Sequence, residues 1–345
     1  MPFVRIIIPT YNRASLVGEA IESGLAQTFQ DFEIIVADDG STDGTEEIVR
    51  NFLSMDSRIR HFKLSHGGAA KTRNLALQVN GKYEYVAFLD SDDLWSSNHL
   101  EESVGVLENH CDVGLVFSRF ETLDFNQNWT IDRLNEREKR MRKPIEFASI
   151  QTQQSVYILD STVVKKSFIR NEFCPHTSTV VVRANVVKRQ KWFDPSLEVY
   201  EDLELFYHIA NCKQSFAFID FVHAKVRCYG DNLTGALRDL SSPVFLQRQK
   251  SVLKYTKTIL GLCSSQEDRS PVLIETGKVA YLIGQCCVEQ FDLSGARYYY
   301  MEALKHQKCW RNFKGLMLSF LPFSVFYSAR KIANAISFNL LIRTF

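Results

Sequence analysis

Short apolar runs alternate with amphipathic segments along the first part of the chain. The runs have the length and β-branched content of buried strands, and they cover residues 3–8, 32–37, 59–64 and 85–89. The segments between them carry helix caps and apolar residues at helical spacing, and they cover residues 14–27, 41–53 and 70–78. This alternation predicts an α/β fold, with a mostly parallel sheet flanked by helices.

Strand and helix patterns continue through the middle of the chain and give way to helical spacing in its last third. Further strands are expected at 113–117 and 179–183, and a further helix at 200–209. After about Ser241 the strand signal fades and the remaining apolar spacing is helical. We therefore expect an α/β domain over residues 1–238 and a C-terminal helical extension over residues 239–345.

Charge is divided unequally between these parts, although the whole chain carries only +1. Residues 1–240 sum to −7 and residues 241–345 to +8. A basic tail suits an anionic partner such as a membrane surface or an acidic subunit, but a solvated helical surface gives the same composition.

The cysteines and the N-terminal sequence favour a cytoplasmic protein. Eight cysteines are scattered without a Cys-x-x-Cys pair, which is typical of reduced thiols. The chain starts with a strand pattern and not with a signal peptide. The apolar stretch 315–327 contains Pro322 and is shorter than the roughly 20 residues of a membrane-spanning helix.

Acidic residues follow two of the expected strands directly. Asp90, Asp92 and Asp93 come after one apolar run, and Asp38 and Asp39 come after another. Ligands of parallel α/β sheets bind beyond the carboxyl ends of the strands, where these residues are expected. Because clustered carboxylates at buried strand ends need positive charge, the pattern indicates a divalent metal that carries a phosphorylated ligand.

Five motifs in order carry a resemblance to a known family. They are 6–13 (Ile-Ile-Ile-Pro-Thr-Tyr-Asn-Arg), 36–43 (Val-Ala-Asp-Asp-Gly-Ser-Thr-Asp), 71–74 (Lys-Thr-Arg-Asn), 89–93 (Leu-Asp-Ser-Asp-Asp) and the pair Glu201-Asp202. Over about residues 1–235 the chain resembles the family 2 glycosyltransferases of the GT-A fold. The resemblance implies inverting transfer of a sugar from a nucleotide-diphosphate donor to a saccharide or lipid-linked acceptor, with Mn²⁺ or Mg²⁺, in the synthesis of a surface polysaccharide. No nucleic-acid partner is expected.

The resemblance also implies roles for single residues on the donor side. Pro9, Thr10 and Tyr11 would form the floor of the nucleotide pocket. Asp39 would accept a hydrogen bond from the base, although Asp38 and Asp39 also suit a helix N-cap pair. Arg73 would lie near the phosphates or the base of the donor.

A second set of roles concerns the metal and the reaction. By resemblance, Asp90 would contact the ribose or the metal shell, Asp92 would bind the metal, and Asp93 would hold the site or the donor sugar. Asp202 would be the catalytic base that takes the proton from the acceptor hydroxyl, with Glu201 as the alternative.

The chain departs from the family pattern at one position. Many relatives carry Arg-x-His in the last strand of this domain, and the histidine completes their metal shell. Here Tyr229 stands at that position, so the metal would rest on Asp92, phosphates and water, with His223 a poor substitute. The segment 174–176 is expected to line the acceptor cleft.

Other interpretations remain open. A haloacid-dehalogenase-type phosphohydrolase also places Asp-x-Asp after an apolar strand, and a catalytically inactive nucleotide-sugar-binding module would keep the same acids. At the other end of the chain, Trp310, Arg311 and Lys314 precede a short apolar helix expected at 316–321, and Arg330 and Lys331 follow it, which suits either peripheral membrane contact or a core helix.

Overall fold

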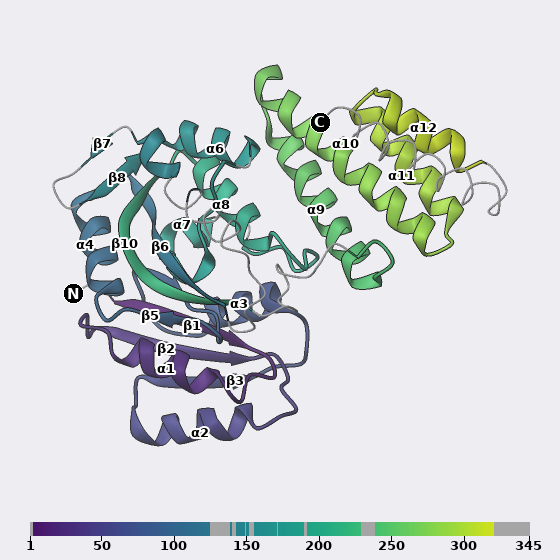
Figure 1. The fold of residues 1–345 in the computed structure, drawn as a ribbon. Helices are drawn as coiled ribbons and strands as arrows, with labels where there is room; N and C mark the ends of the chain where they lie inside the picture. The colour runs from purple at the N-terminus through teal and green to yellow at the C-terminus, as the bar shows by residue number, and fades with distance from the viewer. Residues whose placement is uncertain are drawn as a thin grey trace. The chain divides into compact units, whose positions relative to one another are not determined.

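The computed structural model describes residues 3–124, 139, 143–148, 150–151, 155–170, 172–189, 192–228 and 239–320. The chain divides into two compact units, residues 1–235 and 236–345 (Figure 1). The domain boundary predicted between residues 238 and 239 falls at the edge of a stretch outside the described residues, and it stays a prediction.

A ten-stranded mixed sheet forms the centre of the first unit. Nine strands lie in the order β3-β2-β1-β4-β9-β6-β10-β8-β7, and β5 pairs with β10. The four strands predicted first are all parallel: β1 (Val4–Thr10), β2 (Phe32–Asp38), β3 (Ile59–Lys63) and β4 (Tyr85–Phe88). Their registers place Thr10 opposite Asp38, so the carboxyl ends of β1 and β2 lie at the same edge of the sheet.

The other half of the sheet mixes directions. Its strands are β5 (Leu94–Trp95), β6 (Val113–Asp124), β7 (Ile150–Gln151), β8 (Val156–Leu159), β9 (Val181–Arg183) and β10 (Ser215–Cys228). β9 lies antiparallel between β4 and β6. The strand expected at 179–183 is shorter than predicted. It covers only Val181–Arg183, because the 3₁₀ turn η2 (Thr177–Thr179) includes residue 179.

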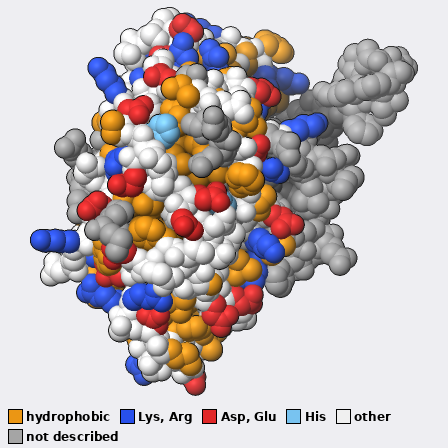
Figure 2. Space-filling model, turned by 90° about the vertical axis from the view of Figure 1, so that its left-hand side faces the viewer, with side chains coloured by type: hydrophobic (Ala, Val, Ile, Leu, Met, Phe, Trp, Pro, Cys, Tyr) orange, Lys and Arg blue, Asp and Glu red, His pale blue; other side chains and the backbone are white. Residues whose placement is uncertain are grey.

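Apolar side chains fill the space between the sheet and its helices. The helices and the other 3₁₀ turn of this unit are α1 (Val17–Leu25), α2 (Thr45–Met55), α3 (Ala69–Gln78), α4 (His99–Asn109), η1 (Lys143–Phe147), α6 (Ser161–Arg170), α7 (Ala184–Arg189) and α8 (Glu201–Asn211). Ile6, Val36 and Ala87 of adjacent strands share one buried cluster with Ile21 of α1 and Leu107 of α4. On the face in Figure 2, acidic and basic side chains are interspersed with apolar ones.

Four helices make up the described part of the second unit: α9 (Pro243–Leu262), α10 (Gln266–Glu289), α11 (Leu293–His306) and α12 (Trp310–Leu318). Val279, Ile283, Tyr300 and Ala303 are among the residues of its own apolar core. This part of the chain is helical, as its sequence predicts. Within the described residues, no helix combines the length and apolar character that crossing a bilayer requires.

Candidate active site

The loops that follow β1 and β2 meet beyond the ends of these strands. The backbone N–H of Asp39 donates to the carbonyl oxygen of Thr10 at 2.8 Å. Pro9 and Thr10 are buried, whereas Tyr11 is exposed and stacks on His66, with 4.3 Å between the ring centroids. The predicted nucleotide floor thus ends in an accessible aromatic face beside Asp39, since His66 also lies 2.9 Å from the Asp39 carboxylate.

Asp38 and Asp39 have different surroundings. Asp38 accepts a hydrogen bond from the backbone of Ser41 at 2.8 Å, the local turn contact that its sequence position also suggests. The carboxylate of Asp39 accepts one hydrogen bond from Gly67 N–H and one from Gly68 N–H, both at 2.8 Å. Asp39 Oδ1 keeps accepting capacity for a ligand N–H, whereas Oδ2 also has His66 Nδ1 at 2.9 Å.

The acidic segment 90–93 turns sharply after β4, and we call it the acid turn. Asp93 N–H donates to the Asp90 carbonyl at 3.0 Å and closes this turn. Burial, and then the charge of Asp90, raise the pKa of Asp92. Burial followed by the charges of Asp90 and Asp92 raises the pKa of Asp93 well above its usual value. The three carboxylates therefore repel one another, which a bound cation would relieve.

Arg13 connects the two acidic strand ends. Its guanidinium Nε lies 3.6 Å from the Asp92 carboxylate. Its backbone N–H donates to the hydroxyl of Thr45, at the start of α2. The loop after β1 therefore contacts both the acid turn and the segment that follows Asp39, and these groups face a common edge of the sheet.

Arg227 of β10 forms hydrogen bonds with two residues of the acid turn. Its backbone N–H donates to Asp93 Oδ1 at 3.1 Å, and its guanidinium donates to the carbonyl of Asp92 at 3.2 Å. This is the arginine of the expected Arg-x-His pattern, while Tyr229 lies outside the described residues. His223 is buried with its Nε2 at 3.0 Å from the carboxylate of Glu102, and no described contact joins it to the acid turn.

Arg73 joins the acid turn to helix α8. One guanidinium nitrogen lies 2.7 Å from Asp90 Oδ1, and another lies 2.8 Å from Glu201 Oε1. The side chain is almost fully buried, so these ion pairs are shielded from solvent. In this structure Arg73 is a link between distant segments, and its contact with donor phosphates or base stays a prediction.

Glu201 and Asp202 form the first turn of α8. The Asp202 carboxylate accepts a hydrogen bond from the hydroxyl of Thr177 at 2.7 Å and another from the backbone N–H of Leu203 at 2.8 Å. Burial raises the pKa of Asp202, and this effect is larger than the opposite effect of the hydrogen bond from Thr177, which lowers the pKa. Burial and the charge of Asp202 raise the pKa of Glu201 to about 7, despite the opposing charge of Arg73. A carboxylate with a raised pKa accepts protons more strongly, as general-base chemistry requires.

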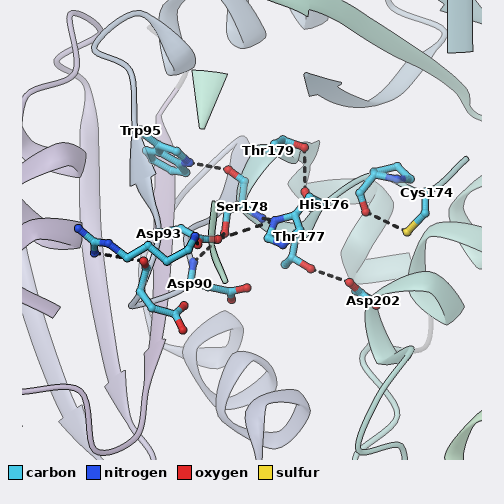
Figure 3. A network of polar contacts seen from close by, with 12 residues as sticks. Asp90, Asp93, Trp95, Cys174, His176, Thr177, Ser178, Thr179 and Asp202 are labelled. Carbon is cyan, nitrogen blue, oxygen red and sulfur yellow. Dashed lines mark hydrogen bonds and ion pairs between the residues drawn. The ribbon is translucent and has the colours of Figure 1, made fainter. Parts of the chain in front are cut away.

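The short turn η2 brings these two parts together, and the sequence did not predict it (Figure 3). Thr177 points toward Asp202, while the neighbouring Ser178 donates to Asp93 Oδ2 at 2.6 Å. The Ser178 hydroxyl also accepts from Asp90 N–H at 3.1 Å. The sequence Thr-Ser-Thr matches no functional motif. Only the path of the chain through η2 and β9 shows that these hydroxyls contact both Asp202 and Asp93.

The oxygen-rich acid turn fits a hard divalent cation with few protein ligands. Asp92 keeps 20% of its side chain exposed, so an ion can reach it. Among the described residues, no three His, Cys, Asp or Glu side chains form a complete metal-binding group. Carboxylate oxygens are the ligands that hard divalent cations prefer, and a site with few of them leaves coordination positions for other ligands.

Comparisons with known proteins agree with this architecture. Residues 5–173 match the family model described as glycosyl transferase family 2, and this segment of the chain belongs to that family. An uncharacterized glycosyltransferase of Rickettsia felis is 32% identical over 231 residues, which are 67% of this chain and 34% of that protein. The putative teichuronic acid biosynthesis glycosyltransferase TuaG of Bacillus subtilis is 39% identical over 32% of this chain and 44% of its own length. The chain spans between 15% and 44% of the length of such curated relatives.

Solved structures confirm the predicted GT-A fold. Staphylococcus aureus TarS 1–349 in complex with UDP superposes with a TM-score of 0.59 at 15% identity, over 95% of this chain and 91% of that one. The mannosyltransferase PcManGT of Pyrobaculum calidifontis, in complex with GDP-Man and Mn²⁺, gives a TM-score of 0.55 at 15% identity, over 95% and 86%.

Proposed function

We propose that the protein transfers a sugar, with inversion, from a nucleotide-diphosphate donor to a saccharide or lipid-linked acceptor. The observation that carries this proposal is the joining of the acid turn to Asp202 through the consecutive hydroxyls of Thr177 and Ser178. These contacts support a donor site at the acid turn and a base at Asp202 that would lie beside one another. The family match argues against the phosphohydrolase alternative.

The nucleotide and the ion belong to the same proposal. Structural neighbours were solved with UDP, UDP-GlcNAc, or GDP-Man and Mn²⁺, which supports a nucleotide-sugar donor and Mn²⁺ or Mg²⁺. Asp92 would hold the ion, with Asp90 beside it. When bound, a divalent cation neutralises negative charge on a diphosphate leaving group. Tyr11 would face the base, and Asp39 would accept its N–H.

Asp202 would act on the acceptor. Its carboxylate would take the proton from the attacking hydroxyl, while Thr177 and the N–H of Leu203 hold the carboxylate in place. The name of TuaG supports an acceptor in surface polysaccharide synthesis. The eight cysteines are scattered along the sequence without a Cys-x-x-Cys pair, which supports a cytoplasmic site of action.

Donor binding can be measured with UDP, GDP, dTDP and their sugars in a thermal-shift screen, with and without Mn²⁺. Because ligands that bind the folded state raise its stability, one nucleotide class should raise the melting temperature more than the others. Asp92→Ala should remove the part of that shift that depends on Mn²⁺, and it should abolish metal-dependent transfer. No response to any nucleotide would contradict the proposed donor site.

Asp202→Asn should abolish turnover and keep donor binding, because the amide has the size of the carboxylate but cannot accept the proton. Release of nucleoside diphosphate in the presence of acceptor measures turnover, and the thermal shift measures binding. Asp112→Asn, at an exposed aspartate, is the matched control and should keep both. Near-normal turnover of Asp202→Asn would show that another group is the base, and a fully inactive wild type that binds donor would favour the binding-module alternative.

A further inference from the structure

Helix α12 of the second unit, drawn near its C-terminal end in Figure 1, has large apolar side chains exposed to solvent. Its buried positions are Asn312 and Gly315, and Ser319 just beyond the helix end is buried as well. The exposed apolar side chains of α12, together with Phe320 just beyond its end, form what we call the α12 stripe, and they are between 42% and 73% exposed: Trp310, Phe313, Met317 and Phe320. A helix that packs on a core normally shows the opposite distribution.

Specific contacts explain why the inner side is small and polar. Asn312 Nδ2 donates to the carbonyl of Gln307 at 2.8 Å and to that of Ala303 at 3.2 Å, and so satisfies acceptors at the end of α11. Gly315 lies so close to Tyr300 that an added Cβ would come within 2.9 Å of the ring. The helix is thus attached through close approach, hydrogen bonds and the partly buried Leu316 and Leu318, which pack against the core, and the stripe is no part of that core.

Positive charge surrounds the stripe. Lys308, Arg311 and Lys314 are exposed on or beside α12. Arg297 of α11 places its guanidinium 4.9 Å from the ring centre of Phe320. After Glu302 the sequence contains no Asp or Glu, but it contains seven Lys or Arg residues. A partner of this surface therefore has to accept apolar side chains and carry negative charge.

We propose that the α12 stripe lies on an anionic membrane surface. Aromatic and methionine side chains would enter the boundary between headgroups and acyl chains, while the basic residues contact lipid phosphates. Tryptophan and phenylalanine suit this boundary, because their large rings are apolar and Trp also has a polar N–H. A second copy of the chain fits less well, since pairing two stripes would bring like charges together. The inference does not rest on the proposed transfer reaction.

The test is sedimentation of the full chain with vesicles of phosphatidylcholine alone or with phosphatidylglycerol added. We expect binding to the anionic vesicles, weaker binding to the neutral ones, and loss of binding as salt rises. The double variant Trp310→Ser/Met317→Ser should bind anionic vesicles about tenfold more weakly or worse, because two exposed apolar groups are lost. Lys308→Glu/Lys314→Glu should weaken binding to anionic vesicles only.

The matched control is Val244→Ser/Ile274→Ser, which removes exposed apolar side chains from α9 and α10 of the same unit and should bind like the wild type. Donor binding, measured by thermal shift, should be unchanged in every variant, so failure of the membrane proposal is distinguishable from failure of the proposed function. Absence of vesicle binding by the wild type, or equal loss in the control, would overturn the proposal. A lipid-free dimer that the stripe variant converts to monomer would assign the surface to self-association instead.

Discussion

Neighbouring hydroxyls in one turn hold acids with different expected roles. Thr177 donates to Asp202, and Ser178 donates to Asp93. A hydroxyl that donates to a carboxylate stabilises its charged form and lowers its pKa. Thr177 therefore opposes the effect of burial on Asp202 and helps to keep this group ionised.

Thr177→Val should move the acidic limb of the rate profile to higher pH. Without the hydroxyl the pKa of Asp202 rises further, so the proposed base stays protonated up to a higher pH. The pH dependence of turnover measures this shift. Thr179→Val is the matched control, because the hydroxyl of Thr179 donates to the carbonyl of His176 and to neither acid. An unchanged profile in Thr177→Val would argue against a role for this hydroxyl.

Among the elements of the second unit, close packing depends on two glycines. The buried ring of Tyr300 on α11 lies between Gly284 of α10 and Gly315 of α12. A Cβ at Gly284 would come within 2.7 Å of this ring, so any larger residue forces the helices apart.

Gly284→Ala should destabilise the second unit by about 1–3 kcal/mol, the usual cost of overpacking a core. Chemical denaturation followed by circular dichroism measures this change. Gly261→Ala, at a helical glycine in α9 with no atom near the added Cβ, should instead stabilise by about 0.5–1 kcal/mol through helix propensity. Equal effects of the two substitutions would show that the contact with Tyr300 is unimportant.

At the scale of the whole molecule, net charge separates the acidic first part from the basic last part. Lowering the pH protonates carboxylates and so adds positive charge to residues 241–345, which already carry +8. Glu302 is a buried carboxylate in that part, with Lys257, Lys305 and His306 around it. Although burial raises its pKa, hydrogen bonds from Lys257 and Lys305 outweigh this effect and lower the pKa to about 2.

The second unit should therefore lose stability as the pH falls from about 4.5 to about 2. A carboxyl group whose pKa is lower in the folded state stabilises above its unfolded pKa of 4.5, and that contribution disappears on descent through the folded pKa. We expect on the order of 1–2 kcal/mol, since both lysines are exposed and solvent screens them. Thermal unfolding of Glu302→Gln should depend less on pH in this window. Glu275→Gln, which removes an exposed pair with Lys278, should keep the slope of the wild type.

The sequence predicted the parallel strands and the acids at their ends because both depend on short segments. Apolar runs fix β1, β2 and β4, and the acids that follow them need only the shared direction of parallel strands to converge. The GT-A fold expected from the resemblance is confirmed by the likeness to solved structures.

Contacts between distant segments were beyond such reasoning. Arg73 and Glu201 are 128 positions apart, and Ser178 and Asp93 are 85 apart. These pairs meet only because β9 inserts antiparallel between β4 and β6, a pairing that no local pattern specifies. A short apolar helix was expected after Lys314, but α12 already begins at Trp310. Only the packed structure shows that Asn312, Gly315 and Ser319 face inward.

The turn from Thr177 to Thr179 has a practical consequence for engineering. Loop exchange is a way to change the acceptor of a glycosyltransferase, and the segment before this turn is the one expected to line the acceptor cleft. Because adjacent residues of the turn contact both Asp202, the proposed proton acceptor, and Asp93 at the end of β4, a foreign loop that runs past residue 176 would disturb both contacts at once. Grafts that stop at 176 would keep this shared anchor.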